Sequence, residues 1–166
     1  MDKDMTFKSE RLFFRGLAED DAEDVVAWRS DPENYRYFLS SRAISVGEHR
    51  EWFQRYLGMG NRFDFVIVDS DGEKVGTCGL SNIDEESCEI SYMIGAKSKR
   101  GLGYAKEAVD RLTRLAFEKL GVKCVEARVI AGNTASMAVL TGVGYSECER
   151  VFRRCAAGVT SPLEGD

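Results

Sequence analysis

Residues 100–105 read Arg-Gly-Leu-Gly-Tyr-Ala and constrain the fold more than any other stretch of the chain. An apolar strand pattern at residues 88–95 leads into them, and apolar positions at helical spacing lead out. Two glycines at a strand-to-helix junction let the backbone turn tightly and lie close to a ligand. The first amides of the helix have no intrahelical partner, so they can bind an anion. The stretch predicts a phosphate cradle with the charge of Arg100 at its lip; an ordinary tight turn is the alternative.

Two other phosphate-binding motifs do not fit the chain. A dinucleotide fingerprint needs a third glycine at the position of Lys106. No Gly-x-x-x-x-Gly-Lys-Ser/Thr run occurs anywhere in the sequence. Both nucleotide-binding classes are therefore disfavoured.

Together with a second block, the cradle resembles the GNAT superfamily of N-acetyltransferases. Residues 100–105 match its Gln/Arg-x-x-Gly-x-Gly/Ala acetyl-coenzyme A signature. Residues 133–136 and 144–145 read Asn-x-x-Ser and Gly-Tyr, where the family has Asn-x-x-Ser/Ala and Gly-Phe. The two blocks have the family's order and separation. The resemblance covers residues 8–153, nearly the whole chain.

The predicted elements give an α/β, GNAT-like three-layer fold with a mixed, mostly antiparallel sheet flanked by helices. Strands are expected at residues 11–17, 63–68, 74–80, 88–95, 122–130 and 145–153. Helices are expected at residues 20–29, from 45 to a glycine at 58 or 60, at 103–120 and at 133–142, with an irregular connection at 33–43. A helical crossover makes the strand at 122–130 parallel to that at 88–95, and the resemblance implies that these two splay apart. One acetyltransferase domain is expected over residues 1–166, with 155–166 a frayed tail.

Length and composition exclude several classes of protein. The chain has 166 residues, which suits one domain, and a net charge of −5, so nucleic acid is not an expected partner. No run approaches the roughly 18 apolar residues of a membrane span, and the N-terminus lacks an apolar signal core. We therefore expect no membrane association and a cytoplasmic location. Five scattered cysteines and one histidine predict no metal site.

The resemblance implies acetyl-CoA as the co-substrate. Its acetyl-pantetheine arm is expected in the opening between the two splayed strands, where one backbone amide can also hold the thioester oxygen. The amides of the cradle are expected to bind the pyrophosphate. The expected coenzyme-binding residues are Tyr92, Met93, Ile94, Arg100, Gly101, Leu102, Gly103, Tyr104, Ala105 and Asn133. For Asn133, a plain helix N-cap is the alternative.

The family resemblance implies direct attack of a primary amine in a ternary complex, so no cysteine is assigned as a nucleophile. A protonated amine does not attack, so a base is required. Glu89 is the first candidate, with a solvent-facing strand carboxylate as the alternative. His49 is the second, because its ordinary pKa of about 6.5 suits a base; the alternative is a helix histidine beside Trp52. Where the family often has an acidic tyrosine, this chain has Leu140, which leaves the general acid unassigned.

The amino-terminal half resembles the branch that acetylates nucleotide-linked amino sugars. The expected acceptor-binding residues are Arg29, Trp52 and Tyr56, since aromatic rings stack on ligand rings and a guanidinium binds a diphosphate. The alternative is that the aromatics only pack helices onto the sheet. A ribosomal-protein N-terminal acetyltransferase and a non-catalytic acyl-CoA-binding module are the competing hypotheses. Relatives usually have one more strand at the end, so a homodimer that completes the sheet and a shorter sheet both stay open.

Overall fold

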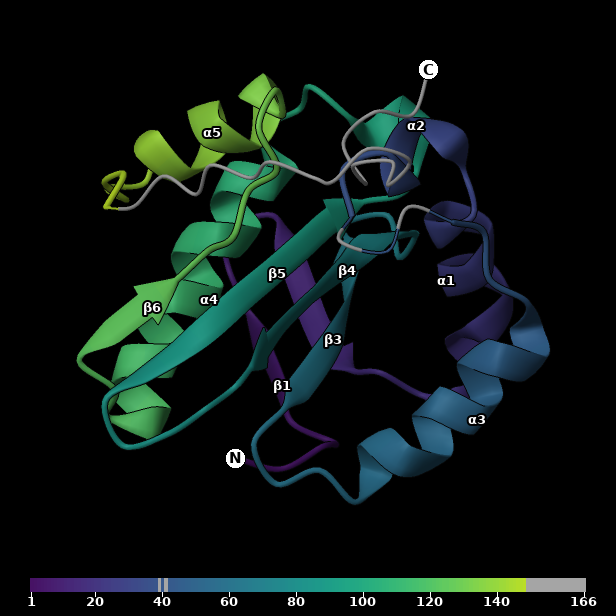
Figure 1. Ribbon diagram of the computed structural model, residues 1–166, viewed down its shortest axis with the longest axis horizontal. Coiled ribbons are helices and arrows are strands. Elements are labelled where there is room, and N and C mark those ends of the chain that lie inside the picture. The colour runs from purple at the N-terminus through teal and green to yellow at the C-terminus, as the bar shows by residue number, and fades with distance from the viewer. Residues whose placement is uncertain (39, 41, 149–166) are drawn as a thin grey trace, which may run out of the picture.

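A six-stranded sheet forms the centre of the protein in the computed structural model (Figure 1). The structure describes residues 1–38, 40 and 42–148. The strands lie side by side in sequence order: β1 (Thr6–Lys8), β2 (Leu12–Gly16), β3 (Phe63–Asp69), β4 (Lys74–Ser81), β5 (Ser87–Ile94) and β6 (Cys124–Glu126). The α-helices are α1 (Ala22–Arg29), α2 (Pro32–Tyr35), α3 (Val46–Leu57), α4 (Tyr104–Leu120) and α5 (Thr134–Thr141). Two short 3₁₀ helices are η1 (Glu19–Asp21) and η2 (Lys97–Lys99).

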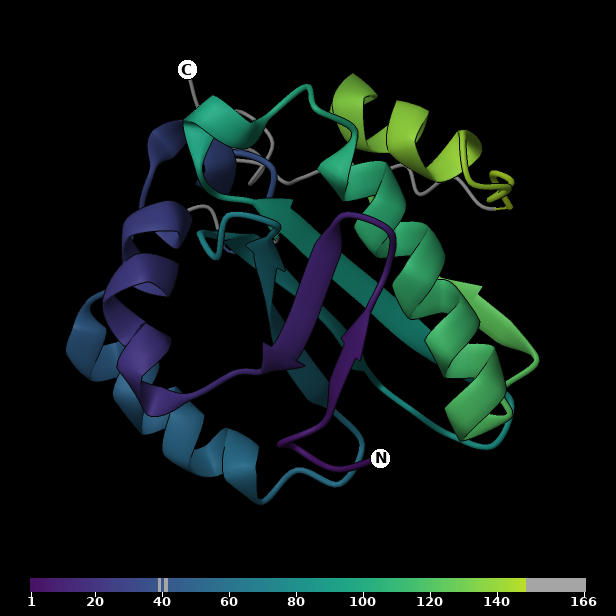
Figure 2. The ribbon, with the colours of Figure 1, turned by 180° about the vertical axis from the view of Figure 1, so that it is seen from behind.

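Helices cover both faces of the sheet. α4 packs on one face with α5 beside it, and α1 and α3 cover the other (Figures 1 and 2). The larger core lies under α4, where Ala108, Val109 and Leu112 have no exposed surface. A smaller core packs Phe53 of α3 against Val66 of β3. The predicted three-layer α/β fold is confirmed.

Local chemistry fixes the limits of the two long helices. Ser45 Oγ accepts a hydrogen bond from the Glu48 amide at 3.1 Å, and the Glu48 carboxylate accepts one from the Ser45 amide at 2.7 Å. This reciprocal capping box starts α3, as the sequence predicts. At the end of α4, Gly121 adopts a left-handed φ of 69° and stops the helix.

A short helix lies where the sequence predicts an irregular connection. Asp31 Oδ1 accepts a hydrogen bond from the Glu33 amide at 3.0 Å, and Pro32 occupies the first helical position of α2. Proline suits that position because its missing N–H would have no intrahelical partner there. The Asp31-Pro32 pair therefore ends one helix and also begins the next.

The two ends of the sheet also differ from the prediction. β1 is a strand of three residues in the polar start of the chain, too short to give a sequence pattern. Residues 145–148 form no strand. The rest of the strand expected at 145–153, and the tail expected at 155–166, lie outside the described residues.

β5 and β6 are parallel, as predicted, but pair over only three residues. The ladder joins Ser87 to Cys124 and ends where Glu89 meets Glu126. β5 continues to Ile94, whereas the chain after Glu126 leaves the ladder, so the strand expected at 122–130 is shorter than predicted. Within the described part of the chain, the second half of β5 has a strand partner only on the β4 side. The two strands diverge at Glu89.

Candidate active site

The cradle (residues 100–105) has a backbone conformation that residues with a Cβ rarely adopt. Gly101 and Gly103 have φ angles of 76° and 83°, both in the left-handed region that glycine enters freely. Gly103 is the N-cap of α4 and has no side chain to cap the helix. The first amides of α4 therefore lie at the positive end of the helix dipole without a side-chain cap, the arrangement that an anion requires.

Arg100 braces the cradle rather than projecting freely from it. Its Nε donates to the Ile94 carbonyl at 3.2 Å, and Nη2 donates to Asn34 Oδ1 at 2.8 Å. The carboxylate of Glu33 lies 3.4 Å from Nη1. Arg100 thus ties α2 to the end of β5, and Glu33 balances part of its charge.

A second arginine, Arg11, lies at the cradle although no sequence motif includes it. Its Nη1 donates to the Leu102 carbonyl at 2.9 Å, and its Nε donates to Glu107 at 2.7 Å. Its guanidinium lies 5.0 Å from the centre of the Tyr104 ring. No spacing rule connects residue 11 with residue 102, because only the fold brings the start of β2 beside the start of α4.

The end of β5 carries the three residues predicted to bind pantetheine, and they do not all face the same way. The Glu86 carbonyl accepts from the Cys124 amide at 3.1 Å, so it faces β6. In a regular strand the backbone groups alternate between the two sides. That alternation directs the backbone of Tyr92 and Ile94 to the open side and the backbone of Met93 to β4.

The side chain of Tyr92 reaches α5. Its hydroxyl lies 2.7 Å from Ser136 Oγ and donates to the Ser136 carbonyl at 3.2 Å. Asn133 Oδ1 accepts from the Ser136 amide at 3.1 Å and caps α5, which is the plain N-cap role. Leu140 is buried and supplies no acid. Tyr92 and the cap of α5 together link the open side of β5 to the second block of the family signature.

Glu89 lies where β5 and β6 part. Its carboxylate accepts a hydrogen bond from Asn82 Nδ2 at 3.1 Å and forms an ion pair with Arg128 Nε at 3.3 Å. Cys88 and Ile90, its neighbours in the strand, are buried in the core under α4. Successive side chains of a strand point to opposite faces, so Glu89 faces the side covered by α1 and α3. Its side chain keeps 20% of its surface exposed.

Two buried polar atoms between α1 and α3 have no hydrogen-bond partner among the described residues: Arg29 Nε and His49 Nε2. His49 is only 4% exposed. Burial lowers its pKa, and the nearby Arg29 charge lowers it further, so the imidazole is neutral at pH 7. Burial lowers the pKa of Arg29 as well. An unpaired buried polar group costs about 1–3 kcal/mol, so these atoms are suited to bind a polar ligand.

The two aromatic residues predicted to bind the acceptor are not equally accessible. Trp52 and Tyr56 are stacked with their ring centres 5.3 Å apart. Trp52 is partly exposed, but Tyr56 has no exposed surface, and its hydroxyl accepts from the Asp64 amide at 3.0 Å. Tyr56 therefore has the packing role that the sequence left as its alternative. In this conformation only Trp52 can present a ring to a ligand.

Arg62, which belongs to no motif of the sequence, connects this side to Glu89. Its guanidinium lies 5.1 Å from the Trp52 ring and makes two hydrogen bonds to Asp64, at 2.6 and 3.0 Å. Burial opposes its charge, but Asp64 and the more distant Glu89 raise its pKa. Charged residues of α1, α3, β3 and β5 thus lie close enough to affect one another's pKa. This group of residues extends to Glu89, where β5 and β6 diverge.

Comparison with known protein families identifies the family of this chain. Residues 11–146 match the family model of the acetyltransferase (GNAT) domain. The chain belongs to the GNAT family. This GNAT protein is an acetyl-CoA-dependent N-acetyltransferase, and the resemblance seen in its two sequence blocks is confirmed.

Several relatives of this GNAT enzyme carry the name N-acetyltransferase. The uncharacterized N-acetyltransferase p20 of Bacillus licheniformis is 32% identical over 149 residues, which cover 86% of this chain and 83% of that protein. The FsC-acetyl coenzyme A-N(2)-transacetylase of Aspergillus fumigatus is 41% identical over 161 residues, 90% of this chain and 68% of that protein. The crystal structure of spermidine N-acetyltransferase from Vibrio cholerae, in complex with CoA and spermine, has a TM-score of 0.79 at 20% identity. The match covers 85% of this chain and 84% of the Vibrio cholerae chain. It shows that the two proteins share a fold.

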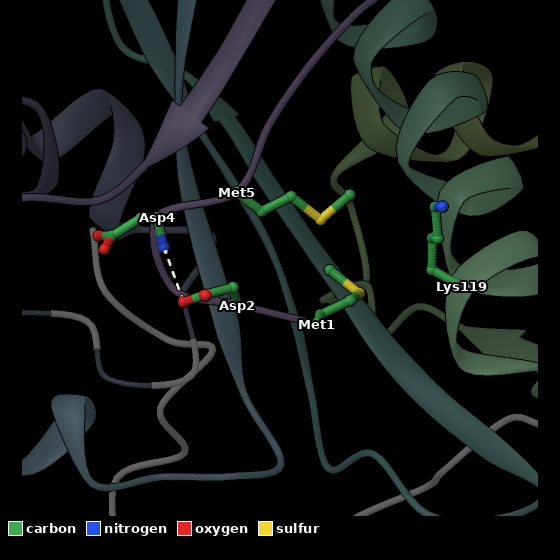
Figure 3. A pocket seen from close by; sticks show the side chains of 5 residues that line it. All are labelled: Met1, Asp2, Asp4, Met5 and Lys119. Carbon is green, nitrogen blue, oxygen red and sulfur yellow. Dashed lines mark hydrogen bonds between the residues drawn. The ribbon is translucent and has the colours of Figure 1, made fainter.

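A surface hollow of the GNAT enzyme lies at the opposite end of α4 from the cradle. Figure 3 shows its lining by Met1, Asp2, Asp4, Met5 and Lys119. Lys119 stands at the C-terminal end of α4, which spans 17 residues or roughly 25 Å. The cradle is at the other end of that helix, so we assign the hollow no part in acetyl transfer.

The described residues include no group of three His, Cys, Asp or Glu side chains arranged to hold a metal ion. None of the helices in the described ranges is long and apolar enough to cross a membrane.

Proposed function

We propose that this GNAT enzyme acetylates the primary amine of a small molecule that also carries an anionic group, and that the acceptor is a nucleotide-linked amino sugar. The observation that carries this proposal is the pair of buried atoms without a partner, Arg29 Nε and His49 Nε2. A phosphate oxygen accepts strong, charge-assisted hydrogen bonds from a guanidinium. A diphosphate would therefore satisfy Arg29, and a neutral imidazole can donate to the same group or to a sugar hydroxyl.

The charges on this side of the sheet favour an anionic acceptor over a polyamine. The carboxylates of Asp64 and Glu89 already have partners, Arg62 and Arg128. The Nε atom of Arg29 has no hydrogen-bond partner among the described residues. A polycation such as spermidine would meet the positive charge of Arg29, and like charges repel most where water is excluded. The likeness to the spermidine enzyme is therefore taken to extend to the fold and not to the acceptor.

The partly exposed ring of Trp52 fits the ring system of a nucleotide sugar. Tyr56 stacks on one side of it and the guanidinium of Arg62 lies 5.1 Å from its centre. A side chain packed in this way loses little conformational freedom when a ligand ring stacks on it. We propose that Trp52 binds a base or a sugar face, and that Tyr56 acts only by supporting Trp52.

Glu89 is the proposed general base. It lies at the divergence of β5 and β6, which is where a coenzyme lying along the open side of β5 would bring its acetyl group. Its carboxylate is held by Asn82 and Arg128. General bases contribute about 10²- to 10⁴-fold to such reactions. His49 is buried and packed on Trp52 with ring centres 5.3 Å apart, so we assign it to binding the acceptor.

The acetyl group passes directly to the amine in this proposal. The amine nitrogen attacks the thioester carbonyl, its proton goes to Glu89, and coenzyme A leaves as the thiolate. The open-side amide of Tyr92 is the proposed donor to the thioester oxygen, a contribution of about 3 kcal/mol for such a donor. The cradle amides bind the pyrophosphate.

Isotope-labelled acetyl-CoA tests the acceptor directly. The enzyme is offered three separate pools: UDP-linked amino sugars, peptides with N-terminal Ser or Ala, and spermidine, with products identified by mass spectrometry. We expect label on the amino sugars. Label on the peptides would support a ribosomal-protein-type acetyltransferase instead, and label on spermidine would contradict the charge argument. Tight coenzyme binding without transfer to any pool would support the non-catalytic module.

Substitution of Arg29 tests whether its guanidinium binds the anionic group of the acceptor. Arg29→Gln is expected to raise KM for the amino sugar about tenfold or more, because one charge-assisted hydrogen bond is lost. KM for acetyl-CoA should not change. Arg50→Gln, on the exposed side of α3, is the matched control and should leave both constants unchanged. An unchanged acceptor KM in the Arg29 variant would rule out the anion contact.

A further inference from the structure

We propose that Arg11 is a positioning residue for the coenzyme: it fixes the orientation of the cradle peptide between Leu102 and Gly103. This inference rests on the assignment of the cradle to the coenzyme pyrophosphate. It concerns a residue that lies before the cradle by about ninety positions in sequence and that carries no motif. The guanidinium of Arg11 nevertheless contacts Leu102, Tyr104 and Glu107, whereas that of Arg100 donates to Ile94 and Asn34.

Residues 9–11 clamp the first turn of α4 through Glu107. The Arg11 amide and its Nε each donate to the Glu107 carboxylate at 2.7 Å. Ser9 Oγ donates to the same carboxylate at 2.6 Å. Burial would raise the pKa of Glu107, but these hydrogen bonds from Ser9 and Arg11 lower it, so Glu107 stays ionised at neutral pH. The clamp fixes where the Arg11 guanidinium lies relative to the helix.

The remaining contact acts on the cradle backbone itself. Arg11 Nη1 donates to the Leu102 carbonyl at 2.9 Å, so that carbonyl points toward the arginine. Because the peptide is trans, its C=O and N–H point in opposite directions. The Gly103 amide therefore points away from Arg11. The Gly103 carbonyl accepts from the Glu107 amide at 3.1 Å, so the Tyr104 amide likewise points out of the start of the helix.

The Leu102–Gly103 peptide needs such a restraint because its C-terminal residue is a glycine. Gly103 has a φ angle of 83°, which few other residues adopt. Glycine has several accessible conformations of similar energy, so the Leu102–Gly103 peptide could reverse. Reversal would turn the Leu102 carbonyl oxygen toward a bound phosphate and remove the Gly103 donor. Arg11 prevents this reversal by holding the carbonyl.

Only a forked side chain can do this while also binding Glu107. Arginine presents several donors in one plane, whereas lysine has a single ammonium group. Arg11 Nη2 lies 3.3 Å from where a Cβ on Gly103 would stand, so the fork also covers the outer side of the N-cap. Arg100 cannot replace it, because its donors already bind Ile94 and Asn34.

The test compares three variants by calorimetric titration with CoA and by steady-state kinetics. Arg11→Gln is expected to weaken CoA binding at least tenfold, the loss that one strong positioning hydrogen bond gives. Arg11→Lys is expected to lose nearly as much, because the positive charge remains but the fork is gone. Arg111→Gln, a neighbouring α4 arginine that donates to the Lys8 carbonyl, is the control and should bind CoA as the wild type does.

A purely structural role would give a different pattern. Arg11 is a half-exposed ion-pair partner, and such pairs contribute about 0–1 kcal/mol to stability, so the melting temperature without ligand should hardly move. We expect KM for acetyl-CoA to rise while kcat at saturation and KM for the acceptor stay within about twofold, as expected for lost ground-state binding. A Gln variant that binds CoA normally, or a Lys variant with full affinity, would overturn the proposal.

Gly103→Val separates this inference from the cradle assignment on which it rests. If Gly103→Val binds CoA normally, the cradle does not hold the coenzyme and both statements are wrong. If Gly103→Val abolishes binding while Arg11→Gln leaves it intact, only the role of Arg11 is wrong.

Discussion

The indole of Trp28 lies directly over Gly95, so close that a Cβ at position 95 would stand 2.1 Å from Trp28 Cγ. Trp28 is on α1 and Gly95 follows the last residue of β5. The contact therefore sets the distance between the helix that carries Arg29 and the strand that carries Glu89. The packing of the Trp28 ring on Gly95 therefore fixes the position of α1, which is proposed to bind the acceptor, relative to β5, which is proposed to bind the coenzyme.

Gly95→Ala is expected to disturb this packing. The added methyl group cannot fit without moving α1, and overpacking of this kind costs about 1–3 kcal/mol. Urea unfolding measures the loss, and the acceptor KM should rise with it. Gly60→Ala is the control, since nothing lies within 4 Å of a Cβ there. In a Trp28→Leu background the cost of Gly95→Ala should shrink, and an equal cost in both backgrounds would contradict the contact.

Gly103→Val is expected to abolish coenzyme binding. Valine is strained at a φ of 83°, and its Cβ would stand 3.3 Å from Arg11 Nη2, so both the N-cap backbone and Arg11 would have to move. Gly121→Val makes the same kind of change at the other end of α4, where φ is 69° and nothing lies within 4 Å. Both variants should lose a similar amount of stability, about 1–2 kcal/mol for a left-handed residue. Only the Gly103 variant should lose affinity for CoA in a calorimetric titration.

Glu89→Gln is expected to reduce kcat about 10²-fold or more at neutral pH, because the amide cannot take the proton of the acceptor amine. KM for acetyl-CoA should change little. Glu126→Gln is the matched control, since Glu126 is exposed and lies opposite Glu89 in the β5–β6 ladder. A Glu89 variant with normal kcat would return His49 to consideration as the base.

Asp21 links pH to stability. It is 1% exposed; burial alone would raise its pKa, but hydrogen bonds from Arg15 and Lys74 lower it to about 2. The unfolded value is about 3.9, so the folded state gains stability from the carboxylate above pH 4 and loses it as the pH falls toward 2. Asp21→Asn should cost about 3 kcal/mol at pH 7, as for a broken buried pair.

The sign of that dependence can be checked by unfolding both proteins in urea at pH 7 and pH 3. The difference in unfolding free energy between wild type and Asp21→Asn should be larger at pH 7. Asp20→Asn, at the exposed neighbouring position, should show a small difference at both pH values. A difference that grows in acid would contradict the role of the ion pair.

Structural features formed by residues close together in the chain could be predicted from the sequence. The Ser45–Glu48 capping box and the glycines at 101 and 103 act over a few residues, and each predicts its own geometry. The parallel β5–β6 pair was also predictable, because a helical crossover leaves few other choices. These features define the fold and the cradle.

Contacts between distant segments were not predictable in this way. Arg11 reaches Leu102, and Arg62 shares its surroundings with Glu89, only because the sheet places β2 beside α4 and β3 near β5. The burial of Tyr56 was not predictable either. The sequence predicts that Tyr56 binds the acceptor, but its side chain is buried beneath Trp52. Burial depends on the packing of whole layers, which periodicity alone does not give.

The early end of the β5–β6 ladder has a consequence for how such an enzyme can change its substrate. The groups proposed to bind the coenzyme are main-chain groups, on β5 and at the start of α4, and these persist through most side-chain replacements. The groups proposed to bind the acceptor are side chains of α1, of α3 and of the segment just before β3, notably Arg29, Trp52 and Arg62. A few substitutions among them can redirect the enzyme to a new amine while the donor half of the reaction stays intact.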